Sequence, residues 1–127
     1  MGGWLTASGI SGFLAVALGA FGAHGLRAKL AEVADGTKRL GWWETAAHYH
    51  LLHALGLGLV ALLVAKAPAA RFTGIAFALG TLLFSGSLYV MALGGPRWLG
   101  AVTPLGGLAF LAGWAVLAWC GWSLGRG

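Results

Sequence analysis

Four histidines supply most of the chemistry that this sequence can place inside its apolar stretches. His48, His50 and His53 lie close together in the chain, and His24 ends the first apolar run. Imidazole titrates near neutral pH, and its ring nitrogens are common ligands of zinc and of haem iron. On one helix, His50 and His53 share a broad face with Tyr49, whereas His48 points away from that face. The pattern is compatible with a metal or haem site on His24, His50 and His53, and equally with hydrogen bonds to hydroxyls or carbonyls of a neighbouring helix.

The acidic residues are all confined to one connecting segment. Glu32, Asp35 and Glu44 fall within 25–44, so we expect no carboxylate deep in an apolar region. This placement disfavours proton relays through buried carboxylates and sites for hard cations. The only cysteine, Cys120, cannot form an internal disulfide or a cysteine zinc site. Without a serine–histidine–acid arrangement, we predict no enzyme, no catalytic residue, no bound metal and no cofactor.

Composition places these residues in a membrane protein. The chain has 127 residues, of which 59% are hydrophobic and only 9% are charged, against roughly 25% charged residues in soluble domains. Uncharged runs at 1–26, 45–65, 72–96 and 98–125 are each long enough for a bilayer-spanning helix. We therefore predict an all-α fold, a single domain over 1–127 built as a bundle of four transmembrane helices. The predicted helices cover about 4–24, 45–65, 72–93 and 103–123.

The charged residues are expected to report topology rather than a nucleic-acid partner. The net charge of +5 comes from basic residues that stand singly between apolar runs, without a basic stripe interleaved with aromatics. We therefore predict no nucleic-acid binding. The predicted partner is the lipid bilayer itself, and both a homo-oligomer and a membrane-protein partner remain open.

Two further patterns concern the arrangement of the helices. In the connection 25–44, Leu26, Leu30 and Val33 recur at helical spacing opposite charged residues, which predicts a short amphipathic helix at the membrane interface between helices one and two. The first predicted helix carries small residues at every fourth position, and such stripes let helix backbones approach closely in lipid. We therefore expect helix one to be a buried packing helix. The members of the stripe are Ala7, Ser11, Ala15, Gly19 and Ala23.

Polar side chains collect in the half of the membrane next to the first and third connections. Because an unpaired polar group is costly in hydrocarbon, we expect these groups to face one another or water in a pocket. The pocket is either a hydrogen-bonded knot that fixes the helices or a site for an anion or polar head group. The candidate residues are His24, Tyr49, His50, His53, Ser85, Ser87 and Tyr89.

Several segments also resemble a known family. They are Gly19-Ala20-Phe21-Gly22-Ala23-His24, Trp43 with Thr45-Ala46-Ala47, Tyr49 with His53-Ala54-Leu55, Phe84-Ser85-Gly86-Ser87-Leu88-Tyr89, Thr103-Pro104-Leu105-Gly106-Gly107 and Gly113-Trp114. In this order they resemble the family called domain of unknown function 423, related to transmembrane protein 256. The resemblance implies a four-helix protein of bacterial inner membranes and no particular activity. The family pattern has glutamine where this chain has His50, so the resemblance favours His24 and His53 for any shared role.

Three functions remain open at this point. The first is an accessory or interaction bundle with a polar pocket in one membrane half, which requires no catalytic group. The second is a small-molecule carrier or channel that acts as an oligomer. The third is metal or haem binding through the histidines.

The distribution of basic residues predicts the orientation of the chain. The first and third connections carry Arg27, Lys29, Lys38, Arg39 and Arg97, whereas the opposite side carries Lys66, Arg71 and Arg126. The positive-inside rule then places both termini outside the cytoplasm. A reporter fused to the C-terminus and active only outside the cytoplasm should therefore show activity. Activity of a reporter that works only in the cytoplasm would reverse the orientation.

Overall fold

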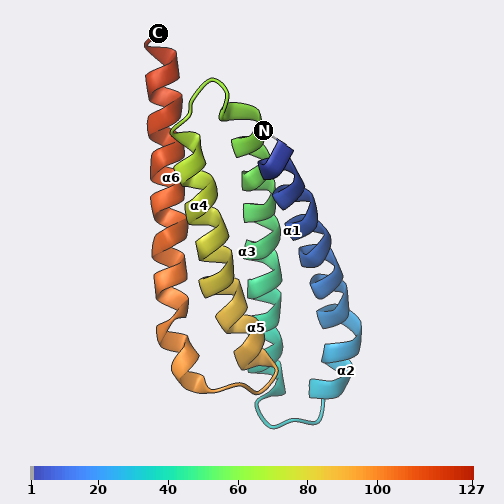
Figure 1. The fold of residues 1–127 in the computed structure, drawn as a ribbon. Helices are drawn as coiled ribbons and strands as arrows, with labels where there is room; N and C mark the ends of the chain where they lie inside the picture. The colour runs from blue at the N-terminus through green and yellow to red at the C-terminus, as the bar shows by residue number, and fades with distance from the viewer. Residues whose placement is uncertain (1) are drawn as a thin grey trace.

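The computed structural model describes residues 2–127 and consists of helices joined by short connections (Figure 1). The helices form four rods that are long and apolar enough to cross a membrane, which confirms the predicted all-α membrane fold. The first rod comprises α1 (Gly2–Phe21), the π-helical turn η1 (Gly22–Leu26) and α2 (Arg27–Leu30), and the second is α3 (Gly36–Leu63). The third comprises α4 (Ala70–Gly80), the π-helical turn η2 (Thr81–Ser85) and α5 (Gly86–Ala92), and the fourth comprises the 3-10 turn η3 (Arg97–Ala101) and α6 (Thr103–Gly125).

The rods are arranged around α3. Helix α1 packs along one side of α3, the α4–α5 rod packs along another, and α6 packs mainly on α4 and η2. Figure 1 shows α1 and α6 at opposite edges of the molecule. Within the most apolar 18-residue stretch of each rod, half of the residues of α3 are buried, whereas only 11% of those of the first rod are buried. The expectation of a buried first helix is therefore wrong, because only α3 covers its narrow stripe of small residues.

Helix α1 nevertheless makes a close interface with α3, through Gly19 of the stripe and through Ser8 and Gly12 beside it. A Cβ atom added at Gly12 would lie 3.9 Å from the Cβ of Ala54, and one added at Gly19 would lie 3.9 Å from the Cβ of Ala47. The Ser8 hydroxyl donates a hydrogen bond of 2.8 Å to the carbonyl of Ala54. Small residues on both helices thus let the two backbones approach, as expected where lipid provides no hydrophobic driving force for association.

The predicted amphipathic segment is folded into the first rod. Helix α2 continues α1 through η1, and Leu26 and Leu30 are buried in a cluster with Trp43 and Ala92. Val33, the third member of the predicted apolar face, is exposed. The two leucines pack on protein because α3 begins at Gly36 rather than near residue 45 and extends beside them.

Ionic contacts stabilise the N-terminal end of α3, which begins earlier in the chain than predicted. Arg39 donates a hydrogen bond of 2.9 Å to the carbonyl of Ala92, and its guanidinium lies 3.7 Å from the carboxylate of Asp35. Asp35 also pairs with Arg97, next to the start of η3. Desolvation acts to raise the pKa of Asp35, but the hydrogen bond from Arg97 and the charges of Arg39 and Arg97 outweigh it and lower the pKa below its ordinary value. Paired charges at this end of the molecule join the first and third connections.

Both π-helical turns lie where two rods touch. At η1, the indole N–H of Trp43 donates a hydrogen bond of 2.7 Å to the carbonyl of Leu18, and a Cβ atom at Gly22 would lie 2.3 Å from the Trp43 ring. At η2, the Ser85 hydroxyl donates a hydrogen bond of 2.8 Å to the carbonyl of Ala46 on α3. Wide turns of this kind are frequent at functional sites, and both pack against the first half of α3.

Adjacent glycines at the start of α6 test this packing. A Cβ atom at Gly106 would lie 2.3 Å from the backbone nitrogen of Phe84 in η2, whereas one at Gly107 would lie 3.9 Å from the Phe84 ring. Gly106→Ala should therefore lower the free energy of unfolding by about 1–3 kcal/mol, because the two backbones must separate. Gly107→Ala should leave stability unchanged or raise it, because alanine has the higher helix propensity. Thermal unfolding of the two variants in detergent measures the difference, and equal melting temperatures would contradict the close approach.

Candidate functional site

The predicted polar residues do not meet in one pocket. His50 and His53 differ in direction by about 60° around α3, so they face different neighbours. His50 faces α1 and α5, whereas His53 faces α6. The His24 side chain lies exposed in η1 and makes no hydrogen bond within residues 2–127. The candidates therefore divide between two sides of α3.

Ser85 and Ser87 hold helices together. The Ser85 side chain is completely buried, and its hydroxyl is bonded to the carbonyl of Ala46. The Ser87 hydroxyl lies 2.5 Å from that of Thr103 and 3.0 Å from the carbonyl of Phe84, to which it donates. These contacts are structural, because each hydroxyl already has a partner on the protein.

His53 is enclosed and fully hydrogen-bonded. Its Nδ1 lies 2.7 Å from the carbonyl of Tyr49, and its Nε2 lies 3.0 Å from the indole nitrogen of Trp114. An indole can only donate and a carbonyl can only accept, so these partners fix a neutral imidazole that carries its proton on Nδ1. The ring stacks on Phe110 with 3.6 Å between centroids and meets the edge of Phe77. With both nitrogens engaged, His53 has no lone pair left for a metal.

A shallow aromatic groove of about 520 Å³ lies beside His53. Tyr49, Phe84 and Phe110 line it, together with Pro104 and Trp114 at the start and middle of α6. The pairs of aromatic rings along it are stacked or tilted against one another. Tyr49 is the half-exposed polar residue of this groove, and the other polar atoms in its walls are already paired.

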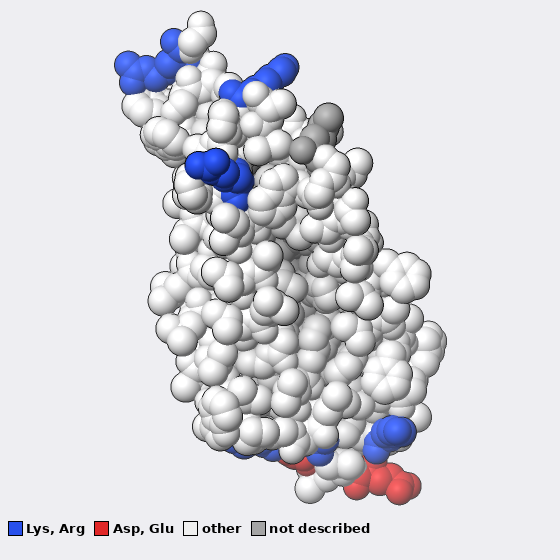
Figure 2. Space-filling model, viewed as in Figure 1, with Lys and Arg blue, Asp and Glu red and all other residues white. Residues whose placement is uncertain are grey.

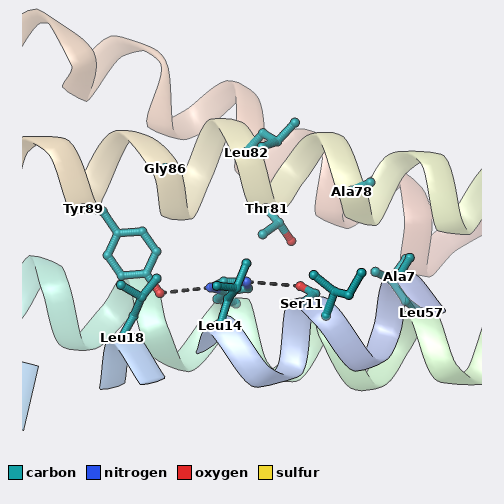
Figure 3. A pocket seen from close by; sticks show the side chains of 12 residues that line it. Ala7, Ser11, Leu14, Leu18, Leu57, Ala78, Thr81, Leu82, Gly86 and Tyr89 are labelled. Atoms are coloured by element: carbon teal, nitrogen blue, oxygen red, sulfur yellow. Dashed lines mark hydrogen bonds between the residues drawn. The ribbon is translucent and has the colours of Figure 1, made fainter. Parts of the chain in front are cut away.

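His50 has a different environment. It is buried, and its Nδ1 lies 3.0 Å from the Tyr89 hydroxyl while its Nε2 lies 3.1 Å from the Ser11 hydroxyl. His50 of α3 thus lies between Tyr89 of α5 and Ser11 of α1, and Figure 3 marks the two hydrogen bonds as dashed lines that reach the labelled Tyr89 and Ser11. Either hydroxyl can donate or accept, so the partners of His50 do not fix one tautomer. The polar chain therefore joins three rods and can exchange its hydrogen positions.

This chain lies in the floor of a second groove, here called the His50 groove. It has a volume of about 490 Å³, with α3 as its floor and with α1 and the α4–α5 rod as its walls. Figure 3 shows wall residues of both rods around the His50 chain. The lining contains no charged residue. Representative wall residues are Ile10, Leu14 and Leu18 of α1, and Thr81, Leu82 and Gly86 of the opposite rod.

On the face shown in Figure 2 the charged residues lie toward the two ends of the molecule, and none of them lines this groove. Glu44, which pairs with Arg27 at 3.1 Å, is the charged residue of α3 nearest to His50 in sequence. Position 50 follows position 44 by 50 − 44 = 6 residues, which is about 9 Å along a helix. Within residues 2–127, no three His, Cys, Asp or Glu side chains come close enough to share a metal ion. The chemistry available in the groove is therefore neutral hydrogen bonding.

From the sequence, Ser11 belongs to the packing stripe, and Thr81 is not among the candidate site residues. Both line the His50 groove. Ser11 stands in the same stripe as alanine and glycine, and the structure shows its hydroxyl bonded to His50 across the α1–α3 interface. The resemblance favoured His24 and His53, whereas the structure places His50 in the groove. A polar residue inside a small-residue stripe is the signal that could have identified Ser11.

The enclosure of His53 leads to a stability prediction. Trp114→Phe removes the donor to His53 Nε2 and leaves a buried acceptor without a partner, which should cost about 1–3 kcal/mol. Trp119→Phe is the matched control on the same helix, because Trp119 is exposed. Thermal unfolding in detergent should show a lower melting temperature for Trp114→Phe alone. Equal values for the two variants would mean that the indole–imidazole bond contributes no stability.

Comparison with known proteins identifies the family. Residues 18–107 match the family described as "Protein of unknown function (DUF423)". The chain is 44% identical to the UPF0382 membrane protein YwdK of Bacillus subtilis over 85% of its own length and 86% of that protein. It is likewise 44% identical to the UPF0382 inner membrane protein YgdD of Escherichia coli, over 85% of this chain and 80% of the relative. No solved structure matches the chain. The chain therefore belongs to the DUF423 family, and it is an integral membrane protein of the bacterial inner membrane.

Proposed function

We propose that this protein is a non-catalytic accessory protein that holds a component of the membrane in the His50 groove. The observation that carries the proposal is the combination of an apolar groove and a polar chain in its floor. Ile10, Leu14 and Leu82 supply apolar walls, whereas His50 and Tyr89 supply hydrogen-bonding groups. Ligand sites in proteins commonly combine apolar walls with a few placed polar groups in this way.

The arrangement of titratable groups supports a role without catalysis. Catalytic histidines usually act with a second group that orients them or exchanges a proton, and a carboxylate often serves. Asp35 and Glu44 are engaged in ion pairs with arginines at one end of the molecule. His53 has both nitrogens bonded, and His50 has only hydroxyl partners. Binding requires none of the missing groups.

The outer rods favour a partner that is itself in the bilayer. Large apolar side chains on α1 and α6, such as Phe13 and Leu111, are exposed and suit contact with lipid or with another membrane helix. The charged residues at the ends are few, and several are paired with one another. A lipid, a second copy of this chain or another membrane protein fits such a surface, whereas nucleic acid does not.

Neighbouring positions on α1 provide the test. A photo-reactive amino acid replaces either Leu14, which lines the groove, or Phe13, whose side chain is 75% exposed and which does not line it. After irradiation of intact membranes, the Leu14 variant should give a discrete adduct of defined mass that the Phe13 variant lacks. Bulk phospholipid should label both variants equally. Identical products from the two positions would show that the groove holds nothing but bulk lipid, and the proposal would fall.

A further inference from the structure

The Tyr89–His50–Ser11 chain in the floor of the groove carries one more polar hydrogen than the hydrogen bonds within the chain require. A neutral imidazole has one N–H donor and one acceptor nitrogen. If His50 donates to Tyr89 and accepts from Ser11, then the hydrogen of the Tyr89 hydroxyl is left over. In the other tautomer, the hydrogen of the Ser11 hydroxyl is left over. The hydrogen bonds to His50 are the only side-chain hydrogen bonds that Ser11 and Tyr89 make within residues 2–127.

Thr81 adds a second free donor. It belongs to the π-helical turn η2 and is partly buried, and its side chain makes no hydrogen bond within residues 2–127. Figure 3 shows its hydroxyl projecting into the groove. A hydroxyl without a partner in an apolar environment costs free energy that a hydrogen-bond acceptor would recover. The groove therefore presents free hydrogen-bond donors and is suited to a ligand that carries a hydrogen-bond acceptor.

Depth and charge restrict the head group of that ligand. His50 lies about 9 Å along α3 from Glu44, whose ion pair with Arg27 marks the polar end of the molecule. The ester carbonyls of a phospholipid are tied to a charged head group, which would have to be drawn into hydrocarbon to reach this depth. No charged residue lines the groove to compensate for such a head group. An uncharged head group meets neither obstacle.

Gly86 makes room for a flat group between Thr81 and Tyr89. A Cβ atom added at Gly86 would meet nothing nearer than the Thr81 carbonyl oxygen at 4.0 Å, so this stretch of the wall is open. The groove volume of about 490 Å³ lies within the range of small-molecule sites. A planar ring can therefore lie against Gly86 with its tail along the apolar residues of α1.

From these observations we infer that the His50 groove binds a neutral lipid of the quinone class. A ring carbonyl accepts hydrogen bonds from the Thr81 hydroxyl and from Ser11 or Tyr89, whichever has the free hydrogen. The apolar tail lies along Ile10 and Leu14. The inference rests on the proposed function, because it names the membrane component that the groove holds.

The test is equilibrium binding of decylubiquinone to the purified full-length protein in phosphatidylcholine nanodiscs. Native mass spectrometry counts the bound quinone, and circular dichroism follows folding. Thr81→Val should weaken binding by about tenfold, which corresponds to one lost hydrogen bond. Gly86→Leu fills the open wall and should abolish saturable binding. Gly121→Leu is the matched control, because a Cβ atom there meets nothing within 4 Å and the position lies on α6, outside the groove.

The ring carbonyls have their own control. Decylbenzene carries the same tail without oxygen and should bind at least about tenfold more weakly than decylubiquinone. Equal binding of the two probes would overturn the inference. Unchanged quinone binding by folded Gly86→Leu and Thr81→Val would also overturn it. A discrete Leu14 photo-adduct without decylubiquinone binding would contradict the quinone inference but leave the proposed accessory function standing. Absence of that photo-adduct would contradict the proposed function as well.

Discussion

The need to pair every polar group inside the hydrocarbon governs the structure of this protein. Side-chain hydroxyls repeatedly donate to backbone carbonyls of a neighbouring rod, as Ser8 does to Ala54, Thr73 to Gly113 and Ser85 to Ala46. Within residues 2–127, no buried side-chain nitrogen or oxygen lacks a hydrogen-bond partner. Because lipid tails are as apolar as leucine, these bonds and the close contacts of small residues do most to fix one helix against the next. Partly exposed hydroxyls at the edges of this network are the groups left for a ligand.

The sequence predicted the four rods because membrane helices follow from uncharged length alone. The bounds of α6 and of the α4–α5 rod lie close to the predicted ones, since Lys66, Arg71 and Arg97 interrupt the apolar runs there. The early start of α3 was not predictable in the same way. Arg39 makes it possible by bonding to the carbonyl of Ala92, which is 53 residues away in the chain. Local composition in 25–44 contains no sign of that partner.

The site was less predictable than the fold, because the sequence does not show which rods surround α3 in the directions that His50 and His53 face. Sequence fixes the directions of His50 and His53 relative to each other, but not which rods occupy those directions. Here α6 covers His53 with Phe110 and Trp114, while α1 covers His50 with Ser11. One histidine is thereby locked as a packing element and the other is left adjustable, although the two residues are close in sequence and chemically identical.

The two tryptophans that hold the first rod also govern how anything enters beside it. Near one end of α1, Trp4 reaches across to α4, where a Cβ atom at Gly74 would lie 2.5 Å from its ring. Near the other end, the indole N–H of Trp43 on α3 donates a hydrogen bond to the carbonyl of Leu18. Between these two contacts α1 packs along α3, and the His50 groove lies between α1 and the α4–α5 rod. A molecule that enters the groove from the bilayer must pass between these two contacts. The distance between them, rather than the volume of the groove, therefore limits the length of the part that can enter at one time.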